Sequence, residues 1–234
     1  MKTIGLIGGL SWEASIEYYR LINESVRGKL GGTHSAKILM YSFDFEEVKK
    51  LQHSGDWETL TNCMVQSAAA LTDAGADFIV ICSNTMHKMA GEIEDQVGTP
   101  LLHIADATAE PILSAGLKRV GLLGTQFTME QDFYKGRLVE KFGLEVLIPS
   151  DDDREIIHQI IYSELVFGRI LDRSRQQYIE IIDRMVRNGA QGIILGCTEI
   201  GLLVNQSHVD IPLFDTTYLH AIAAVDRALE TKSL

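Results

Sequence analysis

The chain has 234 residues, a hydrophobic content of 46% and a formal net charge of −11. This length and this apolar content are typical of a folded protein with one large domain or two lobes of about a hundred residues each. The acidic balance argues against nucleic acid or an anionic membrane surface as a partner.

Cysteine usage and hydropathy indicate where such a chain works. Three cysteines without paired spacing argue against a disulfide framework and favour a reducing compartment. The apolar run at the start is too short for a signal peptide, and no segment reaches the ~20 apolar residues of a membrane span. We therefore expect a cytoplasmic protein. Cys63 falls within a helical apolar pattern, which predicts a buried structural thiol.

Short β-branched segments alternate with longer amphipathic segments along the whole chain, which is the pattern of an α/β fold. In chain order, the expected strands are 3–7, 37–41, 78–81, 101–104, 119–123, 145–148, 192–195 and 211–214. The expected helices are 13–29, 57–74, 85–97, 106–115, 129–142, 153–165, 172–188 and 216–230.

Four strands in each half, each followed by a helix, predict two flavodoxin-like parallel-sheet lobes. We expect the first lobe to comprise residues 1–115 and 215–234, and the second to comprise residues 116–214. The lobes are expected to be related by a pseudo-twofold axis. A ligand is then expected at the carboxyl ends of the strands, between the lobes.

An internal repeat supports this duplication. The segment Gly75–Thr85 aligns without gaps with Gly189–Glu199, and the alignment places Ser83 opposite Cys197. Each segment is an apolar run that ends in small polar or nucleophilic residues, as in a buried strand that delivers side chains into a cleft. Two such strand ends suggest a ligand held from both sides, so that a proton can leave one face of a carbon and return to the other. The alternative is that βα units simply resemble one another.

The first strand is followed by Gly8-Gly9-Leu10-Ser11, which does not fit the dinucleotide fingerprint Gly-x-Gly-x-x-Gly. We expect instead that the glycines allow close backbone approach to a ligand, with free amides, and that Leu10 and Ser11 line the pocket wall.

The third strand leads into Ser83-Asn84-Thr85-Met86-His87. Asn84 and Thr85 are suited to capping a helix, and capping alone would justify them. The same helix start would also suit a carboxylate ligand. His87 is either structural or holds the neighbouring loop. The chain lacks the spaced histidines and cysteines of a metal site, so no metal is expected.

The seventh strand leads into Gly196-Cys197-Thr198-Glu199, which presents a thiol just before a helix. A helix dipole would lower the pKa of this thiol and favour the reactive thiolate. An inert buried cysteine is the alternative. After the fifth strand, Thr125 and Thr128 can donate hydroxyl groups to the same cleft.

The Asn-Thr-Met-His and Gly-Cys-Thr-Glu motifs, the opening Gly-Gly and the tandem lobes together resemble the aspartate/glutamate racemase family. The similarity is greatest to the L-aspartate/glutamate-specific racemases, in which Thr rather than Cys precedes Asn-Thr. This resemblance implies a homodimer and a two-base mechanism. The mechanism needs neither pyridoxal phosphate nor any other cofactor. The resemblance assigns Cys197 as the second-lobe base that acts on the L enantiomer, and Ser83 to the position of the first-lobe acid.

The first-lobe motif departs from the common pattern, because Cys82 is displaced by one residue from the position before Asn-Thr. In an extended strand, a shift of one residue turns the side chain to the opposite face. We therefore expect Ser83 to face the substrate and Cys82 to face the packed side. A hydroxyl is a poorer base than a thiol, so we expect the two directions of racemisation to be unequal. Cys197 should remove the α-proton readily, whereas Ser83 should mainly supply a proton.

Residues 83–85 and 197–199 are expected to grip the α-carboxylate and the amine of the substrate. The resemblance adds Gln52 as a substrate contact. It also shows that the lysine found near Val166 in some aspartate racemases is absent, which favours a broad acceptance of aspartate and glutamate. The predicted substrate-binding residues are Leu10, Gln52, Asn84, Thr85, Thr125, Thr128, Thr198 and Glu199.

Two other functions stay open at this point. One is a dicarboxylate isomerase or decarboxylase of the same superfamily. The other is a catalytically weak pair of lobes that binds an amino acid, which the replacement of a thiol by Ser83 would allow.

Overall fold

The computed structural model describes residues 1–230, and the contacts within it divide the chain into two compact units. The first unit comprises Met1–His103 together with the chain from His220 onward, and the second comprises Ile104–Leu219. The lobe boundaries expected after residues 115 and 214 remain a prediction, and the compact units change over at nearby positions.

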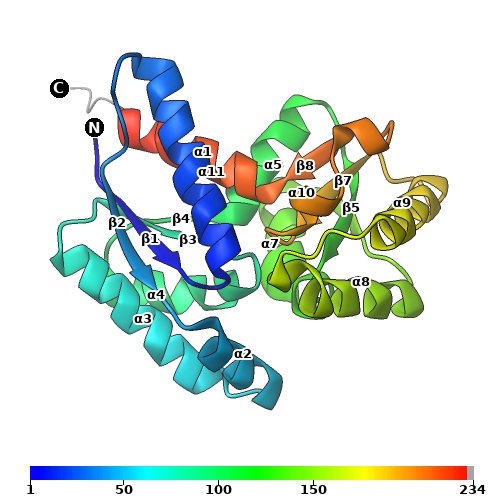
Figure 1. Cartoon of the computed structure of the whole chain (residues 1–234), viewed down its shortest axis with the longest axis horizontal. Coiled ribbons are helices and arrows are strands. Elements are labelled where there is room, and N and C mark those ends of the chain that lie inside the picture. The colour runs from blue at the N-terminus through cyan, green and yellow to red at the C-terminus, as the bar shows by residue number, and fades with distance from the viewer. Residues whose placement is uncertain (231–234) are drawn as a thin grey trace. The chain divides into compact units, whose positions relative to one another are not determined.

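Each unit is built on one parallel sheet of four strands (Figure 1). The first sheet consists of β1 (Ile4–Gly8), β2 (Ile38–Ser42), β3 (Phe78–Ile81) and β4 (Leu101–Leu102), in the order β2-β1-β3-β4. The second consists of β5 (Arg119–Gly124), β6 (Glu145–Leu147), β7 (Gly192–Gly196) and β8 (Leu213–Asp215), in the order β6-β5-β7-β8. The α/β fold is confirmed, since all eight predicted strands are present and both sheets share the strand order of the flavodoxin type.

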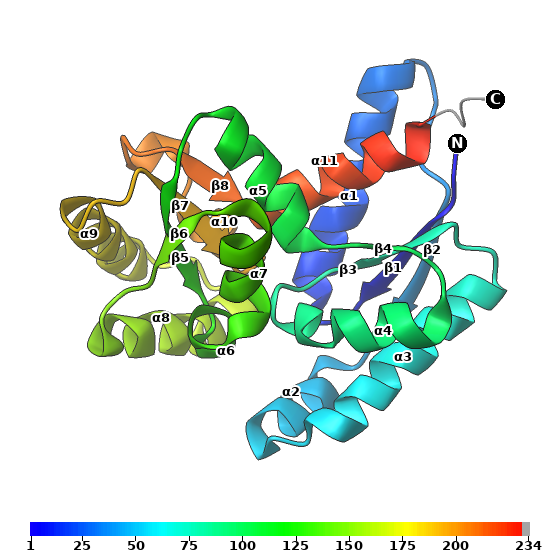
Figure 2. The ribbon, with the colours of Figure 1, turned by 180° about the vertical axis from the view of Figure 1, so that it is seen from behind.

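Helices cover both faces of the first sheet (Figures 1 and 2). They are α1 (Trp12–Leu30), α2 (Phe45–Ser54), α3 (Trp57–Asp73), the 3-10 helix η1 (Thr85–Met89), α4 (Ala90–Val97) and most of α11 (Thr216–Leu229). One face packs against α1 and α11, and the other packs against α3 and α4.

The alternation of side chains along β3 follows these two layers. Phe78 and Val80 lie in the buried cluster with α1 and α11, whereas Ile79 and Ile81 lie in the cluster with α3 and α4. This is the period of two that a strand buried on both faces requires.

Apart from the last 3-10 helix, the helices of the second unit pack with their sheet into one hydrophobic cluster. They are α5 (Ile104–Ser114), α6 (Gln126–Glu130), α7 (Asp132–Phe142), α8 (Asp151–Ser163), the 3-10 helix η2 (Leu165–Phe167), α9 (Asp172–Arg187), α10 (Ile200–Leu203) and the 3-10 helix η3 (Gln206–His208). On α9 the buried residues Tyr178, Ile181, Ile182 and Met185 follow helical spacing, which gives this helix one apolar face.

The observed helices differ from the predicted ones at several places, and the short helices α10 and η3 were not predicted. Helix α2 was not predicted, although Asp44 caps its first turn by accepting from the Glu46 amide and Gly55 ends it in the left-handed conformation. The helix predicted over 85–97 begins as the 3-10 helix η1. The helix predicted over 129–142 is preceded by α6, which the Thr125 hydroxyl caps.

Within residues 1–230, no helix is both long enough and apolar enough to span a bilayer.

Candidate functional site

The turn after β1 is held by contacts within the first unit. Gly9 has a φ of +72°, and a Cβ atom there would lie 2.2 Å from the carbonyl oxygen of Phe43. Its amide donates to the Ser15 hydroxyl at 2.8 Å. The prediction of a free Gly9 amide that faces a ligand is therefore wrong, and this glycine serves the close approach of the loops after β1 and β2.

The two residues after this turn have structural partners. Leu10 is buried in the same cluster as Met86 of η1, and the Ser11 hydroxyl caps α1 by accepting from the Ala14 amide. Leu10 thus supports the segment after β3, and its direct contact with a substrate remains a prediction.

At the end of β3, Cys82 and Ser83 have different surroundings. Cys82 is fully buried, its amide donates to Ile7 at 2.9 Å, and its side chain packs in the cluster that contains Tyr18. Burial raises the pKa of the Cys82 thiol. Ser83 is half-buried. The prediction that Cys82 faces the packed side is confirmed.

Beyond β3 the chain enters the 3-10 helix η1, not an α-helix. Asn84, at its start, has helical backbone angles (φ −69°, ψ −49°), whereas a capping residue is usually extended. A 3-10 helix of five residues has a weak dipole. The predicted use of an α-helix start for a carboxylate is therefore not supported at this position. Asn84 and Thr85 are both buried here.

Helix α2 brings Gln52 to the same segment. The Gln52 side chain is buried, and its Nε2 lies 3.3 Å from the Met86 sulfur. The first unit therefore gathers Leu10, Gln52 and residues 83–85 around Met86.

The second unit has a corresponding cluster where β5 and β7 end side by side. Gly124 pairs with Gly196, and a Cβ atom on Gly196 would lie 2.8 Å from the Leu123 carbonyl oxygen. Two glycines thus allow the strand ends to approach closely, and Cys197 follows directly.

Cys197, Thr198 and Glu199 form a buried hydrogen-bonded group. The Cys197 thiol donates to Oε2 of Glu199 at 3.0 Å, and the Thr198 hydroxyl donates to the same oxygen at 2.6 Å. All three residues are buried. The Glu199 carboxylate thus holds the two neighbouring side chains, and its expected contact with the substrate remains a prediction.

The predicted lowering of the Cys197 pKa is wrong. Burial raises the pKa of this thiol well above its ordinary value, and the charge of Glu199 and the hydrogen bond to it act in the same direction. The backbone amides of Thr198 and Glu199 oppose this only in part. Helix α10 has four residues, so its dipole is small. The resting side chain is a protonated thiol that donates to a carboxylate.

Thr125 and Thr128 lie at the end of β5, beside this group. The Thr125 hydroxyl accepts from the Thr128 amide at 3.3 Å, and the two hydroxyl oxygens are 3.2 Å apart. The Thr128 side chain lies against the Gly124 and Gly196 positions. The second unit therefore brings together all its predicted site residues, Thr125, Thr128, Cys197, Thr198 and Glu199.

Two tyrosines near this group were missed in the sequence. Burial raises the pKa of Tyr162 on α8 and of Tyr178 on α9, and the nearby charge of Glu199 raises both further. Their sequence signal is only that of buried helix positions, because the approach of α8 and α9 to β7 depends on tertiary packing.

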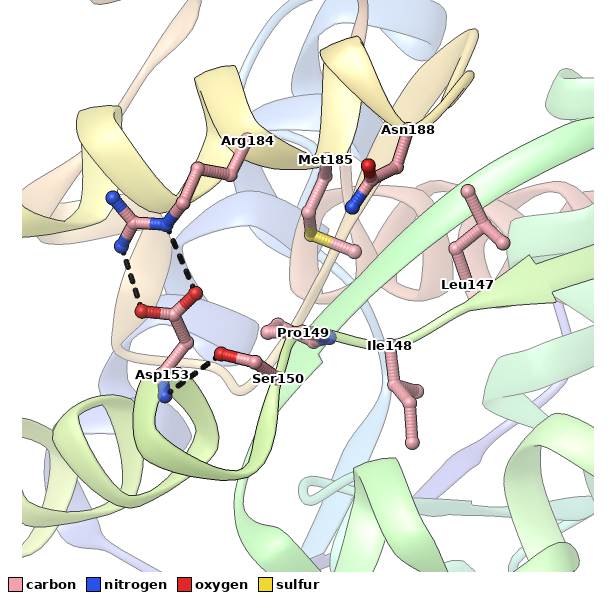
Figure 3. A pocket seen from close by; sticks show the side chains of 8 residues that line it. All are labelled: Leu147, Ile148, Pro149, Ser150, Asp153, Arg184, Met185 and Asn188. Atoms are coloured by element: carbon pink, nitrogen blue, oxygen red, sulfur yellow. Dashed lines mark hydrogen bonds and ion pairs between the residues drawn. The ribbon is translucent and has the colours of Figure 1, made fainter.

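The second unit also contains a small pocket of about 140 Å³ that is built from other residues (Figure 3). It is lined by Leu147, Ile148, Pro149, Ser150, Asp153, Arg184, Met185 and Asn188. Arg184 donates to both carboxylate oxygens of Asp153, at 3.0 and 2.6 Å, and so joins α8 to α9 at the pocket. This arrangement is a structural ion pair and lies outside the predicted site.

Within the described part of the chain, no group of three or more histidine, cysteine, aspartate or glutamate residues is arranged to hold a metal ion.

Comparison with known proteins gives consistent matches over almost the whole chain. The profile of the Asp/Glu/hydantoin racemase family matches residues 7–224. A Yersinia pestis structure, provisionally assigned as an Asp/Glu racemase, is 55% identical with a TM-score of 0.92, and the match covers 98% of this chain and 100% of that one. The structure of an aspartate racemase homologue from Pyrococcus horikoshii OT3 is 35% identical with a TM-score of 0.85, over 98% of this chain and 100% of that one. The broad specificity amino-acid racemase RacX of Bacillus subtilis (strain 168) is 25% identical over 182 residues, which are 76% of each chain.

Proposed function

Because the chain belongs to the Asp/Glu/hydantoin racemase family, we propose that it racemises aspartate and glutamate by a two-base mechanism without a cofactor. Cys197 acts on the L enantiomer, and Ser83 serves the opposite face of the α-carbon. The observation that carries this proposal is the buried hydrogen bond from the Cys197 thiol to the Glu199 carboxylate.

The geometry of this pair suits a base that forms only during the reaction. A thiol with a raised pKa is a poor base in its resting form, but its proton already points at a carboxylate 3.0 Å away. When substrate is bound, the S–H proton passes to Glu199, and the resulting thiolate removes the α-proton of the L enantiomer. The electron pair of the broken C–H bond moves into the substrate carboxylate.

Ser83 completes the inversion by donating its hydroxyl proton to the other face of the carbon. The enzyme is then left with a neutral Cys197 thiol, a protonated Glu199 and a Ser83 alkoxide. Transfer of one proton from Glu199 to Ser83 through solvent restores the resting state. Asn84, Thr85, Gln52, Thr125 and Thr128, together with Leu10 and Thr198, form the remainder of the substrate site.

The expected inequality of the two bases is limited by thermodynamics. The two enantiomers have equal free energy in water, so kcat/KM must be equal in the two directions. The weakness of Ser83 as a base therefore changes kcat and KM but not their ratio. For the D enantiomer, we expect a lower kcat that is balanced by a lower KM.

Proton exchange in heavy water tests the proposal. The wild type is incubated with each enantiomer of aspartate and glutamate, deuterium at Cα is followed by NMR, and the enantiomer ratio by chiral chromatography. We expect deuterium incorporation and inversion, and a loss of about 10²–10⁴-fold in Cys197→Ala, the usual contribution of a positioned acid or base.

The chain offers matched controls for this substitution. Cys63→Ala and Cys82→Ala remove the other two thiols, and both are expected to retain activity. Absence of α-proton exchange across a wide panel of amino acids would overturn the proposal. Tight amino-acid binding without exchange would then indicate a binding protein, and turnover of a dicarboxylate would indicate an isomerase or decarboxylase.

The homodimer that the resemblance implies and the cytoplasmic location expected from cysteine usage and hydropathy are part of the same proposal. Light scattering of the purified protein tests the first, and fractionation of the native cells tests the second.

A further inference from the structure

Three buried histidines lie together in the first unit, and the proposed reaction uses none of them. They are His87 of η1, His103 directly after β4, and His220 of α11. The ring centroid of His87 lies 4.7 Å from that of His103 and 5.5 Å from that of His220. Three imidazoles in contact inside a core are costly to bury unless their polar atoms are paired.

The hydrogen bonds of His220 fix its tautomer. Its Nε2 lies 2.8 Å from the carbonyl oxygen of Leu102, which can only accept, so Nε2 carries a proton. Nδ1 of the same ring lies 2.8 Å from the Tyr18 hydroxyl oxygen, a second hydrogen bond. His220 thereby joins β4, α11 and α1, the helix and strand layers that Figure 2 shows on this side of the sheet.

His87 is fixed in a similar way, but its partner is the residue proposed to donate a proton. Its Nδ1 lies 2.7 Å from the carbonyl oxygen of Ser83, so Nδ1 carries the hydrogen and donates it. Burial, and then the neighbouring His103 and His220, hold the pKa of His87 well below its usual value. The ring is therefore neutral; its Nδ1–H donates to the Ser83 carbonyl oxygen, and the Leu102 carbonyl also interacts with the ring.

Ser83 depends on such a contact because it lies past the end of β3. The amide of Cys82 still donates to Ile7, but Ser83 has already left the sheet ladder. Among the residues that the structure describes, its hydroxyl makes one hydrogen bond, a long one of 3.5 Å that it accepts from the Met86 amide. The direction of the hydroxyl is thus set mainly by the orientation of its own peptide, and His87 holds the carbonyl of that peptide.

We propose that His87 is a positioning residue for Ser83. Its Nδ1–H holds the Ser83 carbonyl and so aims the hydroxyl at the substrate carbon, while the packing of His103 and His220 keeps the imidazole in place. This inference rests on the proposed function for its catalytic consequence, and on the structure alone for the orientation of Ser83.

Two substitutions separate this role from a general contribution to folding. Asparagine carries its side-chain nitrogen at the same distance from Cβ as Nδ1 of histidine, so His87→Asn can keep the hydrogen bond. His87→Leu cannot donate. His53→Leu is the matched control, because the exposed His53 in α2 makes the same type of contact, Nδ1 to the carbonyl oxygen of Lys49 at 2.8 Å.

The activity test uses L-glutamate in heavy water with each purified full-length variant. Removal of the α-proton by Cys197 and its replacement by deuterium on the same face does not need Ser83, whereas inversion does. In His87→Leu we expect inversion to fall on the order of 10²-fold relative to exchange with retention, as for a misplaced reacting group. His87→Asn should restore the ratio, and His53→Leu should leave it unchanged. Equal losses of exchange and inversion in both His87 variants would overturn the positioning role.

A second measurement does not depend on activity. The carbonyl ¹³C resonance of Ser83 should move in His87→Leu and return in His87→Asn. An unchanged Ser83 resonance in a folded His87→Leu protein would overturn the inference even if the enzyme is active. If the wild type shows no exchange at all, the proposed function fails, and this resonance still decides whether His87 holds Ser83.

Discussion

Gly9→Ala is expected to be among the most destabilising single-methyl substitutions in the first unit. The new Cβ would lie 2.2 and 2.3 Å from the backbone oxygen and nitrogen of Phe43, and neither atom can rotate out of the way. The φ of +72° adds the strain of a left-handed conformation, about 1–2 kcal/mol. Separation of the two loops adds about 1–3 kcal/mol, the usual range for overpacking. The expected total is roughly 2–5 kcal/mol.

The assay is urea unfolding of the wild type, Gly9→Ala and Gly28→Ala, followed by circular dichroism. Gly28 lies within α1 and a Cβ atom there would meet nothing within 4 Å, so its replacement by alanine should stabilise the chain by about 0.5–1 kcal/mol. If Gly9→Ala unfolds at the wild-type urea concentration while Gly28→Ala shows its gain, the close approach of Gly9 to Phe43 is refuted.

Three further substitutions test the buried polar groups. Cys82→Ser should cost about 1–3 kcal/mol in urea unfolding, because its hydroxyl would enter an apolar cluster, yet it should leave racemisation unchanged. In Asp153→Asn, about 1 kcal/mol of stability should be lost at pH 7. Since the hydrogen bond to Arg184 lowers the pKa of Asp153, this stabilisation is present above the ordinary carboxyl pKa of about 3.9. It is lost as the pH falls through the lowered pKa, so the difference between the two proteins in urea unfolding should shrink on acidification. Glu199→Gln should lower the pKa of Cys197, measured by alkylation rates in a Cys63→Ala background, while racemisation falls; retained racemisation would exclude Glu199 as the proton acceptor.

The sequence predicted the sheets because their signal is local. A strand buried on both faces needs a short continuous apolar run, and each of the eight runs is bounded by turn residues or helical patterns. The same period of two placed Cys82, the residue after β3, on the packed side, where it lies in one cluster with Phe78 and Val80. Such predictions hold because they depend on strand geometry and on few other contacts.

The parts that could not be predicted depend on the directions of individual side chains. The pKa of Cys197 was expected to fall because a helix follows it, but α10 is short and the Glu199 side chain turns back toward the sulfur. The Gly9 amide was expected to be free, but Ser15 accepts its hydrogen. Neither side-chain direction is encoded in spacing or composition.

The internal repeat aligns the ends of β3 and β7, and the structure holds these two ends in different ways. This difference decides which side chains each end can accept at its reacting position. At the end of β7 the reacting group itself is bonded, because the Cys197 thiol donates to Glu199. At the end of β3 the backbone is bonded, because His87 donates to the Ser83 carbonyl. A bond to the reacting atom adjusts its proton affinity and ties that atom to one partner. A bond to the backbone fixes only position, and it would hold a hydroxyl or a thiol at residue 83 equally well. The first position can therefore accept serine in place of a thiol without rebuilding its surroundings, whereas a change at Cys197 would leave the buried Glu199 carboxylate without one of its two neighbouring donors.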